Sequence, residues 1–251
     1  MDINTRYYAE WSAGRDDYFR KMAAPRLRVA TFLDLIAERV PESLVDLGCG
    51  NGQLLGEIHR RHPTMRLTGI DFSEPQITLN RKRLPGISWL TVDLARPLGP
   101  GHELAGRFEA AVASEIIEHV ETPEVLARNA LWLVRPGTGR LLLSTQSGRV
   151  HETERRVGHR RHFSMVDMRE LLERAGWTDV RAWNCGFPFQ NLAKWMANLA
   201  PDLAMAQFGR ERYGVRQHLV CLALRVAFRL NSTRRGAQLF AVAERPADAG
   251  P

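Results

Sequence analysis

A glycine-rich turn beginning at Gly48 is the part of this sequence best suited to holding a ligand. Three glycines alternate with other residues after an apolar run and an acid, in the order Val45-Asp46-Leu47-Gly48-Cys49-Gly50-Asn51-Gly52. Glycine adopts positive φ easily and lets the backbone approach a ligand closely. A dinucleotide motif GxGxxG would need glycine at position 53, where the chain has Gln53. Asp46 favours a cationic ligand group over a pyrophosphate, although the turn alone could also be a simple tight connection.

Two further acids follow apolar runs of the strand type. Asp71 comes directly after 67–70, and Asp93 comes directly after 87–92. In a parallel sheet, ligands bind outside the carboxyl ends of the strands. Asp46, Asp71 and Asp93 in this order therefore favour a ligand site over a turn with no function.

Histidines gather in two later segments and are candidates for catalysis. His119 ends the segment Ser114-Glu115-Ile116-Ile117-Glu118-His119, and His159 and His162 lie in a polar loop before Phe163. A histidine has an ordinary pKa near 6.5, so it can accept a proton at neutral pH as a general base. The alternative is that each histidine only forms hydrogen bonds within the loop and shapes a pocket.

The same segments also allow a metal site. Glu115, Glu118 and His119 have helical spacing and would share one face if the segment were a helix. A fourth ligand from His159 or His162 would complete a set suited to Mg, Mn or Zn.

The spacing of apolar residues predicts the strands and helices that position these residues. Apolar runs predict strands at 43–47, 67–70, 87–92, 108–113, 140–145, 180–184 and 237–243, and the segments 25–36, 53–62, 74–83, 123–134 and 165–175 have helical patterns. Strands that alternate with helices form a mostly parallel sheet covered on both faces. We therefore expect an α/β fold with a doubly wound, seven-stranded sheet.

Two segments interrupt this rhythm. Residues 146–164 are expected to form a polar loop, and 186–233 a largely helical insertion between the last two strands. The expected organisation is an N-terminal helical cap at 1–40, a core at 41–185 and 234–245, and a helical substrate cap at 186–233.

Composition and charge narrow the function classes. The 251 residues are 44% hydrophobic and 25% charged, which excludes disordered and fibrous chains. The net charge is +7, yet the stretch 206–235 alone has seven arginines and one acid. The basic excess is therefore regional and does not mark the whole chain as a nucleic-acid binder. Three scattered cysteines, no secretory signal and no apolar run of about 20 residues predict a cytoplasmic protein without a membrane span.

The glycine turn and the two later acids resemble the class I S-adenosylmethionine-dependent methyltransferases of the small-molecule type. Their first signature is similar to Asp46-x-Gly48-x-Gly50-x-Gly52, and the second to Gly69-Ile70-Asp71-Phe72-Ser73. The resemblance covers about residues 43–185. It implies that S-adenosylmethionine is the cofactor and that an antiparallel seventh strand ends the sheet.

The resemblance also implies roles for single residues. Asp71 would bind both ribose hydroxyls and Asp93 the adenine amine. The other donor-binding residues would be Tyr8, Asp46, Gly48, Cys49, Gly50, Gly52, Phe72, Ser73, Leu94, Ser114 and Glu115. Tyr8 belongs to an aromatic N-terminal cluster of the kind that closes the donor pocket in this family.

We therefore predict that the protein transfers a methyl group to an oxygen or nitrogen of a small molecule and has a role in biosynthetic tailoring. The acceptor is expected to be anionic or carrier-bound. His119, His159 and His162 are the candidate catalytic residues, and no metal is assigned. One alternative is a metal-dependent RNA 3′-terminal 2′-O-methyltransferase, because the Glu115, Glu118 and His119 spacing resembles the Hen1 type. Another is a binding module that keeps the fold without catalysis.

Overall fold

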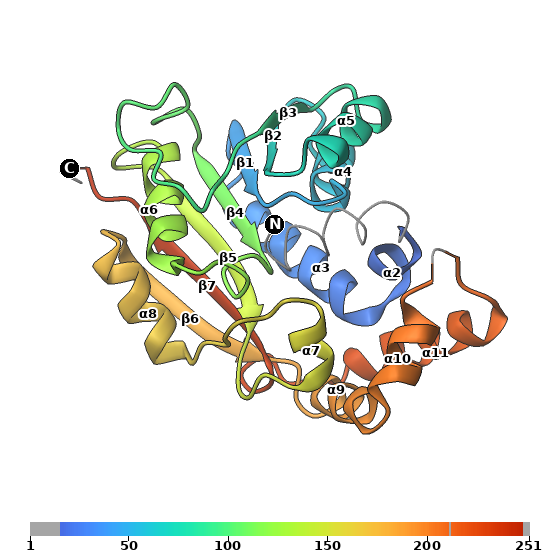
Figure 1. Cartoon of the computed structure of the whole chain (residues 1–251). Helices are drawn as coiled ribbons and strands as arrows, with labels where there is room; N and C mark the ends of the chain where they lie inside the picture. The colour runs from blue at the N-terminus through green and yellow to red at the C-terminus, as the bar shows by residue number, and fades with distance from the viewer. Residues whose placement is uncertain (1–15, 211, 248–251) are drawn as a thin grey trace.

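A seven-stranded sheet organises the chain (Figure 1). The computed structural model describes residues 16–210 and 212–247. The strand order is β3-β2-β1-β4-β5-β7-β6, and only β7 runs antiparallel to its neighbours. The strands are β1 (Ser43–Leu47), β2 (Arg66–Asp71), β3 (Ser88–Thr91), β4 (Ala110–Ser114), β5 (Arg140–Gln146), β6 (Thr178–Cys185) and β7 (Gln238–Glu244). This confirms the predicted doubly wound α/β fold.

Helices cover both faces of the sheet (Figure 1). The short helix α2 (Asp16–Lys21) precedes α3 (Ala23–Glu38), and α3 packs on one face with α4 (Gln53–Arg61) and α5 (Glu74–Arg83). The other face is covered by α6 (Pro123–Leu133) and α8 (Met165–Arg174). All five residues of β1 are buried, which is why this strand is mainly apolar, with Ser43 and Asp46 as its buried polar residues.

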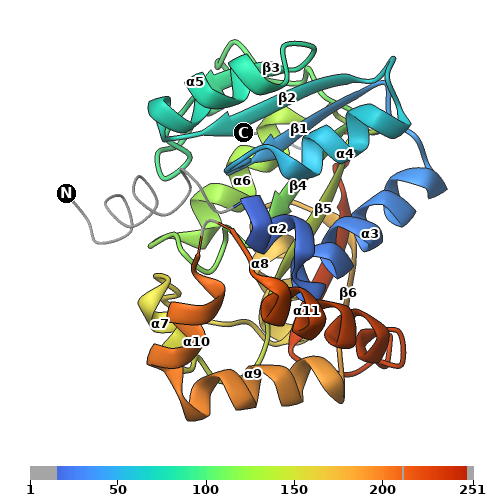
Figure 2. The same ribbon diagram turned by 90° about the vertical axis from the view of Figure 1, so that its right-hand side faces the viewer.

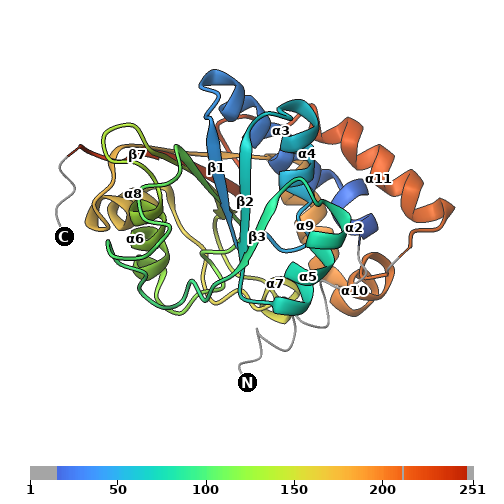
Figure 3. The same cartoon turned by 90° about the horizontal axis from the view of Figure 1, so that it is seen from above.

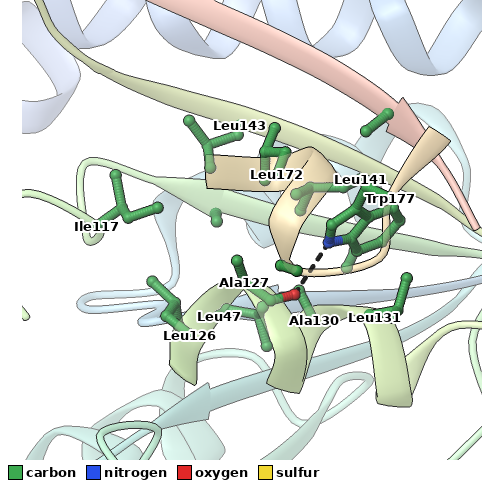
Figure 4. Close-up of a cluster of buried hydrophobic side chains, with 14 of the residues drawn as sticks. Leu47, Ile117, Leu126, Ala127, Ala130, Leu131, Leu141, Leu143, Leu172 and Trp177 are labelled. Atoms are coloured by element: carbon green, nitrogen blue, oxygen red, sulfur yellow. Dashed lines mark hydrogen bonds between the residues drawn. The ribbon is translucent and has the colours of Figure 1, made fainter. Parts of the chain in front are cut away.

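Trp177 is the largest side chain buried between α6, α8 and the sheet (Figure 4). Its exposed fraction is 2%, and its Nε1 donates a hydrogen bond to the carbonyl oxygen of Ala127 at 2.9 Å. A buried indole N–H needs such a partner. The ring therefore joins α6 to the start of β6 both by packing and by this bond.

The strand order places the ligand-binding edge. The connections from β1 lead in one direction to β2 and β3 and in the other to β4 and β5, so the order reverses between β1 and β4. Ligands bind at the carboxyl ends of the strands on either side of such a reversal. The glycine turn after β1 and the segment after β4 meet at this point.

The segment between β5 and α8 differs from the expected loop, because it contains the five-residue helix α7 (Glu152–Arg156). The backbone N–H of His151 donates to the Glu154 carboxylate at 2.6 Å and so caps this helix. A single charged turn has no apolar periodicity, so the sequence pattern did not indicate it. The third predicted strand is also shorter than expected, since β3 ends at Thr91 and Asp93 lies in the following loop.

Three helices lie between β6 and β7, in the segment expected to be a helical insertion. They are α9 (Phe189–Leu199), α10 (Pro201–Phe208) and α11 (Val215–Phe228). Figures 2 and 3 show them together at one end of the molecule, with α7 beside α10. They therefore lie next to the loop that carries His159 and His162.

Candidate active site

The three glycines of the turn after β1 all have positive φ, of 70° at Gly48, 48° at Gly50 and 72° at Gly52. A Cβ at Gly48 would lie 2.4 Å from the Ile116 side chain, and one at Gly52 would lie 2.6 Å from Trp89. At Gly50 a Cβ would meet no atom of the described residues within 4 Å. Gly48 and Gly52 are therefore required for packing, whereas Gly50 borders open space that a ligand can enter.

Asp71 is held against this turn by hydrogen bonds to its carboxylate. One oxygen accepts from the Gly50 N–H and the other from the Ser73 N–H, each at 3.0 Å. The Asn80 side chain also donates to the Gly50 carbonyl at 2.7 Å. Burial raises the pKa of Asp71, and the backbone hydrogen bonds oppose this shift. A carboxylate has about four acceptor positions, so capacity remains for two ligand hydroxyls.

Asp46 is a buried carboxyl group beside Asp71, with an exposed fraction of 2%. Within the described ranges, its side chain forms no hydrogen bond or ion pair with another residue. Burial and the nearby charge of Asp71 raise its pKa to about 8. A cationic ligand group beside it would favour the ionised form, so Asp46 fits a donor that carries an ammonium.

Some of the neighbouring residues predicted to bind the donor also stabilise the local fold. The Ser73 hydroxyl caps α5 by accepting from the Gln76 N–H at 3.4 Å. Cys49 is buried and its N–H donates to the Ile70 carbonyl at 2.9 Å. Phe72 exposes 42% of its surface at the end of β2 and can still cover a ligand.

The loop after β3 has an exposed acid, Asp93, near its start. Asp93 forms an ion pair with Arg96 at 3.1 Å and is half-exposed. Leu94 has its side chain in the hydrophobic core, so only its backbone could contact a ligand. Tyr8 lies outside the described residues.

After β4 the chain turns sharply at Glu115, which has a positive φ of 54°. The Glu115 carboxylate accepts hydrogen bonds from Gln146 at 2.9 Å and Gln238 at 2.8 Å, and lies 3.7 Å from Arg28. Burial opposes ionisation, but Arg28 and these donors outweigh it and lower the pKa of Glu115. Ser114 lies just before, with its hydroxyl 3.3 Å from that of Ser144.

The three predicted histidines form one cluster. The ring centroids of His119 and His159 are 4.6 Å apart, and Nδ1 of His159 lies 3.0 Å from Nε2 of His162. Burial lowers the pKa of His119 to about 4 and that of His159 to about 2, and it also lowers the pKa of His162. All three imidazoles are therefore neutral at neutral pH.

Glu118 lies beside this cluster and has no exposed surface. One carboxyl oxygen accepts from the Thr145 hydroxyl at 2.8 Å, while the other, Oε1, is buried and has no hydrogen-bond partner among residues 16–210 and 212–247. Burial and the charge of Glu115 raise the pKa of Glu118 well above its usual range. One ligand atom from each of Glu118, His119 and His159 lies within 4.8 Å of the others.

The alternative metal set of Glu115, Glu118 and His119 is not formed by the local backbone. Residues 115–119 form a turn and not a helix, with the His119 N–H donating to Ile116 at 3.0 Å. Glu115 therefore does not share a face with Glu118 and His119, and its oxygens are directed toward Gln146 and Gln238. The metal-type grouping consists of Glu118, His119 and His159 instead.

The insertion is attached to the histidine loop by polar contacts that the sequence did not indicate. Asn198 of α9 accepts from the N–H and the hydroxyl of Thr153, each at 3.0 Å. Lys194 forms a partly buried ion pair with Glu154 at 2.7 Å, and Glu154 also lies 3.9 Å from His162. No periodic pattern links residues about forty positions apart, so only the tertiary structure reveals these partners.

Comparison with known proteins identifies the family of this chain. A family model described as a methyltransferase domain matches residues 15–182. The trans-aconitate 2-methyltransferase of Acidovorax ebreus is 36% identical over 78 residues, which are 31% of this chain and 30% of that enzyme. The chain thus matches less than a third of the length of this curated relative.

Solved structures share the fold at low identity. Phosphoethanolamine N-methyltransferase 2 of Haemonchus contortus aligns with a TM-score of 0.62 and 13% identity, over 97% of this chain and 57% of that one. The N-methyltransferase NodS of Bradyrhizobium japonicum aligns with a TM-score of 0.57 and 21% identity, over 72% and 89% of the two chains. The family model matches most of the length of the chain, and the glycine turn and the strand order agree with it. The chain therefore belongs to the class I S-adenosylmethionine-dependent methyltransferases.

Proposed function

We propose that this methyltransferase transfers the methyl group of S-adenosylmethionine to an oxygen or nitrogen of a small molecule, in biosynthetic tailoring. The observation that carries the proposal is the attachment of α9 to the histidine loop through Asn198 and Lys194. This contact holds the helical insertion beside the carboxyl edge of the sheet. A covered acceptor site favours a small substrate over a long polymer.

In this proposal the donor is held by the turn after β1 and by the loops after β2, β3 and β4. Asp46 accepts from the donor's ammonium, Asp71 from the ribose hydroxyls and Asp93 from the adenine amine. Gly50 provides the open approach. The bound donor supplies an electrophilic methyl group on a sulfonium, and the protein orients it toward the acceptor.

The histidine cluster orients the acceptor in this proposal. Neutral imidazoles accept a hydrogen bond from an acceptor O–H or N–H, which directs a lone pair toward the methyl group. With pKa values of about 4 and 2, His119 and His159 are weak proton acceptors. Proximity and orientation then supply most of the acceleration, which is consistent with an in-line displacement that needs no strong base.

The proposal is tested by measuring S-adenosylhomocysteine release with panels of small amines, alcohols and carboxylates, and with short RNAs. We expect turnover with a small molecule and a strong loss of kcat in His119→Gln, with donor affinity unchanged in calorimetry. Turnover on RNA alone would overturn the small-molecule assignment. No binding of S-adenosylmethionine would overturn the enzyme assignment and leave a binding module.

A metal-assisted RNA 2′-O-methyltransferase is the second candidate, because Glu118, His119 and His159 can present three ligand atoms within 4.8 Å. The buried, unpartnered Oε1 of Glu118 fits such a use. This candidate predicts activity that is lost in a chelator and restored by Mg, Mn or Zn, and RNA binding that weakens steeply with salt. Full activity in a chelator would exclude it.

We further propose that the protein acts in the cytoplasm. Cys49, Cys185 and Cys221 are all free and buried, as expected in a reducing compartment. Across the described residues, no helix has the length and apolar character needed to cross a membrane.

A further inference from the structure

Helix α11 carries a continuous apolar stripe on its exposed side. The stripe consists of Val215, Leu219, Leu222 and Val226, with Leu230 just beyond the helix, and the exposed fractions are 77%, 61%, 56%, 54% and 71%. Their spacing of three and four residues places them on one side of the helix. Single exposed leucines are common, but a row of this length on one helix is not.

The opposite side of α11 is packed against the protein. Gln217, Cys221 and Phe228 are buried there, and the Cys221 thiol lies 3.5 Å from the Met22 sulfur. Arg225 donates to the Lys21 carbonyl at 3.0 Å. The helix is therefore anchored next to α2 and α3, and Figures 2 and 3 show it at the outer edge of the molecule. Its apolar stripe faces away from the core.

The neighbouring helix α9 has a similar face. Leu192, Trp195, Met196 and Leu199 recur at three and four residues and are 48% to 64% exposed. The other side of α9 contacts the histidine loop, as described above. The insertion therefore presents apolar side chains from two of its helices to the outside.

The charge around α11 indicates what covers the stripe. Six arginines of this region are exposed, namely Arg210, Arg212, Arg216, Arg229, Arg234 and Arg235. In the part of the chain that the structure describes, none of them forms an ion pair with a carboxylate. A second copy of this chain would bring two such basic regions together and is disfavoured by repulsion. An anionic surface with an apolar interior complements both the charge and the stripe.

We propose that α11 and its flanking arginines dock parallel to an anionic phospholipid bilayer, with the stripe in the region between headgroups and acyl chains. Amphipathic helices with arginines beside a row of leucine and valine bind this region, and the attraction depends on anionic lipid. Trp195 of α9 suits the same interface, where tryptophan is enriched. The protein would then be a peripheral membrane protein whose insertion contacts lipid, whichever acceptor it methylates.

Cosedimentation with vesicles tests this proposal. We expect the full chain to bind vesicles of equal parts phosphatidylglycerol and phosphatidylcholine, and to bind pure phosphatidylcholine vesicles weakly. Leu219→Glu and Leu222→Glu should each lower the partition coefficient about tenfold. Arg216→Gln with Arg229→Gln should lower binding to the anionic vesicles selectively.

Val166→Glu is the matched control, because Val166 is 60% exposed but lies on α8, on the other face of the sheet. It should bind vesicles like the wild type, and all variants should keep the thermal unfolding curve of the parent. Three results would overturn the proposal. These are no vesicle binding, equal binding to neutral vesicles, or a dimer in sedimentation velocity that Leu219→Glu dissociates.

Discussion

Replacing Asp71 with alanine removes the carboxylate that links the glycine turn to the end of β2. The wild-type side chain accepts one hydrogen bond from Gly50 and one from Ser73, each at 3.0 Å. In our proposal it also accepts from both ribose hydroxyls of the donor. The variant therefore loses two contacts within the protein and two contacts to the ligand.

The magnitude follows from the number and type of these contacts. A hydrogen bond to a charged group contributes about 1.5–3 kcal/mol, so losing two ligand contacts costs about 3–6 kcal/mol. This corresponds to a donor Kd that rises about 10²- to 10⁴-fold. The two N–H groups left without an acceptor also lower the unfolding free energy, by about 1–3 kcal/mol each if they remain buried.

Calorimetric titration with S-adenosylmethionine, well below the unfolding temperature of the variant, measures the effect on binding. Glu74→Ala is the matched control, because Glu74 is an exposed acid three residues further on, with its carboxylate 3.1 Å from Arg81. Its donor Kd should not change. An Asp71→Ala variant that stays folded and binds the donor within about threefold of the wild type would refute the assignment.

Three further predictions concern the turn, a buried acid and the core. Gly50→Ala should abolish donor binding at a stability cost of about 1 kcal/mol. Gly52→Ala should destabilise the protein more, because its Cβ would lie 2.6 Å from a tryptophan ring. Calorimetry measures donor binding by the two variants, and urea unfolding measures their stability. The pKa of Asp46 is about 8 in the folded chain, against an ordinary value of 3.8 for the unfolded chain. Between these two pH values the folded state binds more protons than the unfolded state, so the free energy of unfolding falls as the pH rises. Asp46→Asn removes that loss, and the gain in Tm of the donor-free protein should be larger above pH 8 than near pH 4. Trp177→Ala should cost about 3–5 kcal/mol in urea unfolding, and Trp195→Ala, at a 55% exposed site, should change stability by less than about 0.5 kcal/mol.

The order of strands and helices was predictable because it depends on the local spacing of apolar residues. Runs such as Ser43–Leu47 are mainly apolar because both faces of the strand are covered, and Gly48, Gly50 and Gly52 supply the positive φ that the following turn requires. The family resemblance then followed from the glycine turn and from Asp71 and Asp93 at the ends of the next two predicted strands. Elements without periodicity were missed, as α7 shows, since a capped turn of four charged residues and a threonine has no apolar face.

The candidate site was predictable as a set of residues but not as an arrangement. Glu115 and Glu118 are three residues apart, yet one is held by Arg28, Gln146 and Gln238 while the other is buried beside Thr145. The positive φ at Glu115 directs the two carboxylates to different surroundings, and a glutamate in the sequence does not predict a positive φ. An ordinary histidine pKa near 6.5 likewise suggested a general base, whereas burial makes His119 and His159 much weaker bases.

The sequence by itself determined the sheet, the glycine turn and the family, because these depend on periodicity and on glycines and acids at short range. Only the tertiary structure decided which charges are buried, which carboxyl oxygens lack a partner and which face of α11 points outward. Those properties depend on contacts between segments that are distant in the chain, such as Lys194 with Glu154 and Cys221 with Met22. Burial then sets the electrostatics of the site, since desolvation and not residue identity moves the pKa values of Asp46, Glu118 and the histidines.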